Sequence, residues 1–300
     1  MCPCVIRATL SLKIILRAEV SAMKAVVFTG DRTLELMEVP DPTPGPGEVV
    51  LEIKASGMCG SDLHQYRAPR KEKLNIAGHE PCGVVAAVGA GVPEEQVKVG
   101  DRVMDHHYSG CGVCKHCREG WSQMCLEGTI VYGGVGDGAH AKYMLVPAHT
   151  VVKLPDALSF KTGAAISCGT GTAYGALKRL DLAGDETIAI FGQGPVGLSA
   201  TQLAKAMGAR VIALDISTER RDLATKFGAD EVVDPVANDV VEAIRDLTHG
   251  EARKNHWIAA PTPKRVGLRY KRSASGVRRA LWVKQAMLPS TCPTTSFDGR

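Results

Sequence analysis

The sequence predicts an α/β protein in which a strand-rich first part precedes part of a doubly wound parallel sheet. Three observations support this class. Short apolar runs separated by Gly and Pro turns fill residues 23–156, as expected of many short strands. Strands and helices then alternate between residues 187 and 247, the pattern of a parallel βαβ sheet. A glycine-rich loop joins the first of these strands to its helix, where such sheets bind nucleotides.

The elements follow from local patterns in chain order. Six strands are predicted in the first part, at residues 24–28, 48–56, 83–92, 101–104, 141–148 and 150–155. Residues 159–180 change to a helical period. Strands at 187–191, 211–215 and 231–233 then alternate with helices at 195–208, 217–227 and 237–247. We therefore divide the chain into an extension (1–22), a strand-rich domain (23–156), a partial parallel-sheet domain (157–250) and a tail (251–300).

The first 22 residues precede a cleaner beginning at Met23. Lys13 and Arg17 interrupt the apolar stretch that a secretory signal requires. We interpret this extension as the product of an upstream start codon, with a transit peptide as the alternative. No run approaches the roughly 18 apolar residues of a membrane helix, so we predict no membrane partner.

The tail has a different composition from the rest of the chain. Residues 251–300 hold eleven Lys and Arg but only two acids, and they lack the preceding strand–helix rhythm. A reading-frame shift explains the change and predicts a loosely packed tail, an unpaired sheet edge and a nearly inactive chain. The alternative is a basic arm for nucleic acid, but no known binding motif is present and the acidic remainder opposes it. We therefore predict no nucleic-acid partner.

Four cysteines crowd into fifteen residues with the spacing C-x2-C-x2-C-x7-C. Disulfides between such close cysteines strain the bridge geometry, whereas four thiolates hold zinc in a closed tetrahedral site. The alternative is a chance cluster of buried thiols. Cysteines at the spacing of metal ligands also favour a reducing compartment over a secreted disulfide scaffold, so we predict a cytoplasmic protein. The ligands of the predicted structural site are Cys111, Cys114, Cys117 and Cys125.

A second set of metal-binding residue types is spread along the chain. Cys59 and His79 have the chemical softness that zinc prefers, and Cys168 supplies a third ligand unless it is only a buried thiol. Glu80 binds instead of Cys168 or alternates with water. Asp62 is expected to orient His79 from behind, as metal-bound histidines usually require. Three protein ligands leave one position open, which is typical of a catalytic zinc site.

Other polar residues near these motifs have different expected roles. Ser61 and His64 are candidates for moving a proton from the metal site to solvent. His106 and His107 are expected to be surface or packing residues, and Cys82 a thiol that binds no metal.

The glycine-rich loop has the sequence GQGPVG, and it follows a predicted strand and opens a predicted helix. Its first glycine permits the tight turn, the second lets a pyrophosphate approach, and the third lets helix and strand pack. Asp215 ends the next strand, where a carboxylate binds ribose hydroxyls and favours NAD over NADP; Arg220 and Arg221 blunt that preference. The alternative is a purely structural turn with Asp215 as a helix cap. The predicted cofactor-binding residues are Gly192, Gly194, Pro195, Val196, Gly197, Asp215 and Arg220.

Five motifs occur in the order GMCGSDLH, GHEPCGVV, GCGVCKHCREGWSQMC, SCGTGTAYGALK and GQGPVG. With them, the chain from about Met23 to about Gly250 resembles the zinc-dependent medium-chain alcohol dehydrogenases, a group that includes polyol and threonine dehydrogenases. The resemblance implies a GroES-like β-barrel domain holding both zinc ions and a Rossmann domain, here incomplete, holding NAD(P). By the same resemblance, Cys59, His79 and Cys168 become catalytic-zinc ligands.

The function implied by the resemblance is hydride transfer between a primary or secondary alcohol and NAD(P), with the aldehyde or ketone as product. Zinc acts as a Lewis acid in such a site. The family also implies a homodimer or homotetramer. The alternative is a non-catalytic zinc-binding remnant, suggested by the missing half of the Rossmann domain. A zinc-free quinone reductase is disfavoured because such proteins lack these ligands.

Overall fold

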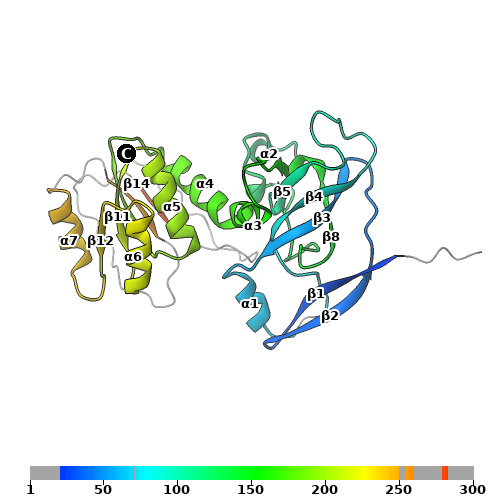
Figure 1. Cartoon of the computed structure of the whole chain (residues 1–300), viewed down its shortest axis with the longest axis horizontal. Coiled ribbons are helices and arrows are strands. Elements are labelled where there is room, and N and C mark those ends of the chain that lie inside the picture. The colour runs from blue at the N-terminus through cyan, green and yellow to red at the C-terminus, as the bar shows by residue number, and fades with distance from the viewer. Residues whose placement is uncertain (1–20, 71, 250–254, 260–278, 283–300) are drawn as a thin grey trace, which may run out of the picture.

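The computed structural model describes residues 21–70, 72–249, 255–259 and 279–282, which form two lobes joined by a run of helix (Figure 1). Antiparallel strands build the first lobe, and a parallel sheet covered by helices builds the second. Nearly all of the N-terminal extension and most of the tail lie outside the described residues. Among the described residues, no helix has both the length and the apolar character needed to cross a membrane.

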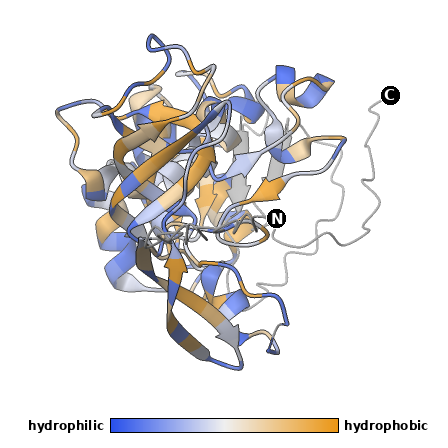
Figure 2. Ribbon diagram, turned by 90° about the vertical axis from the view of Figure 1, so that its right-hand side faces the viewer, coloured by the Kyte–Doolittle hydropathy of each residue, from blue (hydrophilic) through white to orange (hydrophobic). Residues whose placement is uncertain are grey.

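The first lobe is centred on a five-stranded antiparallel sheet in the order β8-β3-β4-β5-β9, and β1 and β2 pair separately. Hydrophobic residues are frequent along these strands (Figure 2), and Val49, Leu51, Val85, Val103 and Met144 form the core. We expected a closed barrel, but the described strands form an open sheet whose edge strands are β8 and β9. The strands are β1 (Ala22–Gly30), β2 (Thr33–Pro40), β3 (Glu48–Gly57), β4 (Glu80–Val88), β5 (Arg102–Asp105), β8 (Tyr143–Pro147) and β9 (Val151–Lys153).

Two excursions from this sheet carry the residues of functional interest. The first follows β3 and contains the short helix α1 (Asp62–Arg67). The second lies between β5 and β8. Its elements are β6 (Tyr108–Ser109), α2 (Lys115–Arg118), the 3-10 turn η1 (Ser122–Met124) and β7 (Ile130–Val131); a further 3-10 turn, η2 (Ala148–Thr150), precedes β9.

The helical run between the lobes is not a single regular helix. It consists of α3 (Phe160–Ala165), the π-helical turn η3 (Ile166–Thr170) and α4 (Gly171–Leu180). Ser159 caps its start, because its hydroxyl accepts the Thr162 N–H at 3.2 Å. A π-helical turn within an α-helix is rare and frequently marks a functional site.

The second lobe is a parallel sheet in the order β12-β11-β10-β13-β14. Both faces of its strands are buried: Ile188 and Ile190 pack toward α4 and α5, and Ala189, Ile212 and Leu214 pack toward α7. Because both faces are buried, these strands are apolar at consecutive positions instead of alternating between apolar and polar residues. The described elements are β10 (Thr187–Phe191), α5 (Pro195–Ala206), β11 (Arg210–Leu214), α6 (Thr218–Lys226), β12 (Glu231–Val233), α7 (Val240–Leu247), β13 (Asn255–Ala259) and β14 (Arg279–Trp282).

The strands β13 and β14 correct the prediction of an unpaired sheet edge. We expected only three parallel strands, with the edge of β10 open. Instead, β13 pairs in parallel with β10 from Thr187↔Asn255 to Phe191↔Ala259, and β14 pairs with β13. These strands were not predicted because the tail as a whole is basic and lacks a regular pattern. The first of them has the short sequence NHWIA, in which only Trp and Ile are typical strand residues. The rest of the tail lies outside the described residues.

Candidate catalytic zinc and cofactor sites

Four metal-binding side chains converge from three separate segments. Cys59 lies between β3 and α1, His79 and Glu80 lie at the start of β4, and Cys168 lies in the π-helical turn η3. Their ligand atoms all lie within 4.8 Å of one another, and the sulfur atoms of Cys59 and Cys168 are 3.9 Å apart. Two thiols, an imidazole and a carboxylate in this arrangement form a donor set that zinc accepts.

Asp62 fixes the orientation of two of these side chains. Its Oδ1 lies 2.9 Å from Nδ1 of His79, and both side chains are buried. Its Oδ2 accepts the backbone N–H of Cys59 at 2.8 Å. Since Nδ1 is occupied, His79 presents Nε2 to the metal-binding cluster. A carboxylate behind a ligating histidine is the usual support of a zinc site, and the sequence predicted it.

The ionisation of the cluster fits a cation. The hydrogen bond from Cys168, opposed by burial, lowers the pKa of Cys59 to about 2. Burial lowers the pKa of His79, but hydrogen bonds to Asp62 and Cys59 outweigh it and raise the pKa to about 10. Burial and the Cys59 thiolate raise the pKa of Glu80 to about 7. A thiolate beside a protonated imidazole is a pair in which a zinc ion replaces the shared proton.

The two predicted proton-carrying residues occupy different environments. Ser61 is buried, and its Oγ lies 3.3 Å from Nε2 of His79. His64 is exposed on α1, and its backbone N–H donates to the Ser61 carbonyl at 3.0 Å. Within the described part of the chain, their side chains share no hydrogen bond. Ser61 therefore lies at the metal-binding cluster, and His64 lies one helical turn away at the surface.

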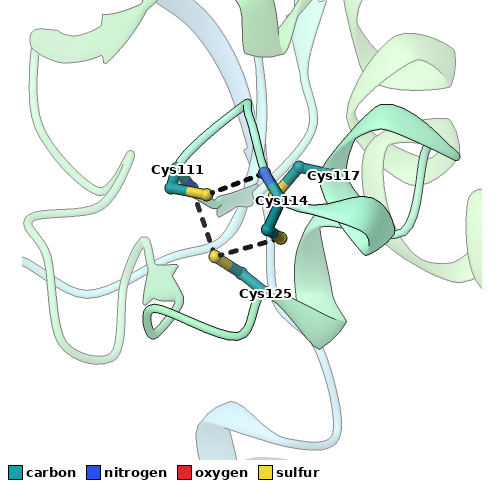
Figure 3. A group of neighbouring side chains, drawn as sticks. All are labelled: Cys111, Cys114, Cys117 and Cys125. Atoms are coloured by element: carbon teal, nitrogen blue, oxygen red, sulfur yellow. Dashed lines mark hydrogen bonds between the residues drawn. The ribbon is translucent and has the colours of Figure 1, made fainter.

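The four-cysteine loop folds around a common centre (Figure 3). All four sulfur atoms lie within 4.8 Å of one another. Backbone N–H groups of Cys111 and Cys114 donate to the sulfur atoms of Cys125 and Cys111 at 3.2 and 3.3 Å. Hydrogen bonds from the backbone of Leu126 and Cys117 lower the pKa of Cys114 to about 6, which favours the thiolate that zinc requires. This set fits a closed zinc site without a position for substrate.

The glycine-rich loop has the geometry of a pyrophosphate cradle at the start of α5. Gly192 has a φ of +84°, in the region that favours glycine. A Cβ on Gly197 would lie 1.8 Å from the Gly192 carbonyl oxygen, whereas a Cβ on Gly194 would meet nothing within 4 Å. Gly194 therefore faces open space that a phosphate can enter. Pro195 occupies the first turn of the helix, and half-buried Val196 follows.

Asp215 closes this loop from the next strand. Its two carboxylate oxygens accept the backbone N–H groups of Gln193 at 2.7 Å and Ser217 at 2.9 Å. Arg220 reaches the same carboxylate, with Nη1 3.6 Å from Oδ2. Gln193 was not predicted as a residue of this site. Its side chain is fully buried, and its Nε2 donates to the Ile190 carbonyl at 3.0 Å. A buried amide in the variable position of G-x-G-x-x-G stiffens the loop, and no spacing rule signals it.

The aromatic rings beside the metal-binding cluster were not predicted from the sequence either. His107 is buried, and its ring centroid lies 5.0 Å from that of His79. Burial and the charge on His79 lower the pKa of His107 to about 3. The Tyr108 ring lies against that of His107, with centroids 4.2 Å apart. Burial, followed by the charges on Cys168 and Cys59, raises the pKa of Tyr108. Among the described residues, His107 does not belong to the set of side chains that could hold the metal.

Known domain families and proteins match both lobes. The family "Alcohol dehydrogenase GroES-like domain" matches residues 45–156, and "Zinc-binding dehydrogenase" matches residues 195–255. The uncharacterized zinc-type alcohol dehydrogenase-like protein YphC of Escherichia coli strain K12 is 42% identical over 243 residues, covering 77% of this chain and 68% of that protein. An alcohol dehydrogenase of Geobacillus stearothermophilus is 42% identical over 230 residues, covering 75% and 67%.

Solved structures show the same similarity in three dimensions. AibC is 34% identical with a TM-score of 0.73, covering 80% of this chain and 68% of that one. Acetophenone reductase from Geotrichum candidum NBRC 4597, in complex with NAD, is 36% identical with a TM-score of 0.66, covering 80% and 69%. A putative zinc-binding dehydrogenase from Sinorhizobium meliloti 1021 bound to NADP is 31% identical with a TM-score of 0.71, covering 80% of this chain and 70% of that one.

A GroES-like lobe with a zinc-type donor set beside a dinucleotide-binding sheet defines a zinc-dependent oxidoreductase. The chain belongs to the zinc-dependent medium-chain alcohol dehydrogenase family. Its members are enzymes that act on small molecules, and the cofactors are zinc and NAD. These findings support the predicted oxidoreductase, and nothing in them favours the alternative of a non-catalytic remnant.

Proposed function

We propose that this chain oxidises a small alcohol, or reduces the matching aldehyde or ketone, at the cluster formed by Cys59, His79, Cys168 and Glu80. The main support for this proposal is that the four side chains lie close together and that Asp62 contacts Nδ1 of His79. Cys59, His79 and Cys168 hold the catalytic zinc, and Glu80 lies beside it. When bound, zinc supplies Lewis-acid polarisation of the alcohol oxygen, and NAD supplies the hydride acceptor.

The residues of the chain supply positioning and proton transfer. Ser61 lies next to Nε2 of His79, where its hydroxyl accepts the alcohol proton and passes it toward His64 at the surface. The glycine-rich loop and the N-terminus of α5 bind the pyrophosphate of NAD. Asp215, at the end of β11, binds the adenosine ribose. The remaining cofactor contacts proposed are Gly192, Gly194, Pro195, Val196, Gly197 and Arg220.

The four-cysteine site holds a second, structural zinc, which stabilises the loop between β6 and β7. We further propose a strand-rich catalytic domain over 23–156 and a Rossmann domain from 157, a homodimeric or homotetrameric assembly, and a cytoplasmic location. Relatives are named for L-threonine, sorbitol and acetophenone. Because these substrates differ, the names do not select the substrate of this chain.

The experiment that tests this function compares two cysteine variants of the chain. We had expected a nearly inactive chain because of an open sheet edge, but β13 and β14 pair at that edge. We therefore expect purified wild type to reduce NAD in the presence of secondary alcohols, and Cys59→Ser to abolish this reduction. Cys82→Ser is the control. Cys82 is buried whereas Cys59 is half-buried, and the Cys82 sulfur donates to the Val103 carbonyl at 3.2 Å and lies outside the metal-binding cluster. Equal loss of activity in both variants would contradict the proposed ligand set.

A further inference from the structure

The side chain of His140 contacts both strand ends that lead to Cys59 and His79. Its Nδ1 lies 2.8 Å from the hydroxyl oxygen of Ser56, which stands near the end of β3, three residues before Cys59. The ring also packs closely against Gly78, the residue before His79, because a Cβ on Gly78 would lie 2.4 Å from Nδ1 of His140. One imidazole therefore links the two segments next to the metal-binding cluster.

The backbone on each side is shaped for this contact. Gly78 has a φ of +91°, in the region that favours glycine, and the His140 ring occupies the space that a side chain there would fill. The pairing of β3 with β4 shifts register between Ile53 and Ala55. Such a bulge redirects the side chains that follow and is common next to active sites. The direction of Ser56 is thus a consequence of the bulge.

Hydrogen bonds also fix the main chain of His140. Its N–H donates to the Ala77 carbonyl and its carbonyl accepts the Val26 N–H, both at 2.8 Å. Within the described part of the chain, Nε2 is buried and makes no hydrogen bond, so Ser56 is the polar partner that sets the ring orientation. Burial lowers the pKa of His140, and Asp62 opposes the shift only partly. The ring is therefore neutral near pH 7 and adds no charge to the cluster.

This support complements that given by Asp62. Asp62 contacts the imidazole of His79 and the backbone N–H of Cys59, whereas His140 contacts the chain just before each of these two residues. Ligands bind a metal well only when their geometry is held within roughly 0.5 Å. Partners outside the ligand set commonly contribute about tenfold to a hundredfold in metal affinity.

We propose that His140 is a positioning residue for the catalytic zinc, because its hydrogen bond with Ser56 and its packing on Gly78 hold Cys59 and His79 at the separation that the metal requires. This inference rests on the proposed function, since it takes Cys59 and His79 as ligands. It assigns a role to a histidine that, among the described residues, lies outside the set of side chains that could hold the metal.

The test measures zinc release from the purified protein into the chelating dye 4-(2-pyridylazo)resorcinol. The phase of release that is absent from Cys59→Ser belongs to the catalytic site. His140→Leu and His140→Asn have nearly the same shape, but only Asn keeps a polar group for Ser56. We expect about tenfold faster release from the catalytic site in His140→Leu and in Ser56→Ala. His140→Asn should release zinc at a rate closer to that of wild type.

Controls separate local positioning from general destabilisation. Release from the four-cysteine site should stay unchanged in every variant, and His149→Leu, which changes an exposed imidazole, should alter neither phase. Equal acceleration of both phases, equal rates in His140→Leu and His140→Asn, or a wild-type rate in Ser56→Ala would overturn the inference. These outcomes leave the proposed function intact. A wild-type protein without the phase that Cys59→Ser lacks would contradict the proposed function and the inference with it.

Discussion

Asp215 is a buried carboxylate with one observed task and one proposed task. It closes the glycine-rich loop through the backbone of Gln193 and Ser217, and its charge opposes a 2′-phosphate on the ribose. Arg220 lies 3.6 Å from the same carboxylate, so a positive group is already present for a phosphate. Cofactor preference therefore depends on the balance between Asp215 and Arg220.

Changing Asp215 to Asn is expected to shift this balance. Without the negative charge, Arg220 is free to pair with a 2′-phosphate, so the NAD over NADP ratio of kcat/KM should fall by about tenfold to a hundredfold. Steady-state kinetics with both cofactors measures the ratio. Asp234→Asn is the control, because Asp234 pairs with Arg221 at 3.1 Å instead. An unchanged ratio in Asp215→Asn would contradict the assignment.

Asp105 predicts a pH-dependent stability. Burial raises the pKa of this carboxyl well above its usual value, and the Thr150 hydroxyl opposes the shift only partly. A raised acid pKa means that folded-state stability declines as pH rises from the unfolded pKa, near 4, to the folded pKa. Asp105→Asn removes this penalty. Its Tm advantage over wild type should be small at pH 4 and should grow toward pH 8; a constant difference across this range would show the explanation wrong.

Residues whose roles depend on spacing were predictable, and those whose roles depend on tertiary contact were not. Cys59 and His79 stand in recognisable motifs, and Asp62 follows Cys59 by three residues. His107 and Gln193 carry no such signal. The contact of His107 with His79 exists only because the segment before β6 folds back across the start of β4.

The strand–loop–helix element from β10 to α5 was predicted almost residue by residue. Its glycines nevertheless have different tasks: Gly197 permits packing against Gly192, and Gly194 leaves room for a ligand. The alternation of buried strands and amphipathic helices made β10, β11 and β12 recognisable. The strand β13 was missed because it is short and lies in a basic segment, where pairing with β10 rather than local pattern defines it.

The two glycines predict opposite outcomes when changed to Ala. Gly197→Ala places a Cβ 1.8 Å from the Gly192 oxygen and should destabilise the fold by about 3 kcal/mol or more. Gly194→Ala meets no protein atom within 4 Å and keeps a permitted φ of −77°, so Tm should hardly change. It should still weaken NAD binding by about tenfold or more, because the methyl group enters the phosphate space. Thermal unfolding and NAD titration of both variants check this contrast. A Gly194→Ala variant that binds NAD normally would refute the proposal that the glycine-rich loop binds the pyrophosphate.

On the scale of the whole molecule, we propose that one metal site stabilises the fold and the other carries the chemistry. The catalytic set joins β4, the turn before α1 and the π-helical turn between the lobes, whereas the four cysteines lie within one excursion of the first lobe. Cys114→Ser is therefore expected to lose one zinc ion and to lower Tm by roughly 5–10 °C. Calorimetry with zinc analysis tests this, and a Cys114→Ser variant with full zinc content would contradict the closed site.

The most direct test of the account measures zinc content and alcohol-dependent NAD reduction on the same preparations of wild type and Cys59→Ser. We expect two zinc ions per chain and turnover in wild type. In Cys59→Ser we expect one zinc ion, a nearly unchanged Tm, and turnover lower by at least about a hundredfold, because Lewis-acid polarisation is worth several kcal/mol. A wild-type chain without tightly held zinc, or a Cys59→Ser variant that keeps both its zinc ions and its turnover, would contradict it.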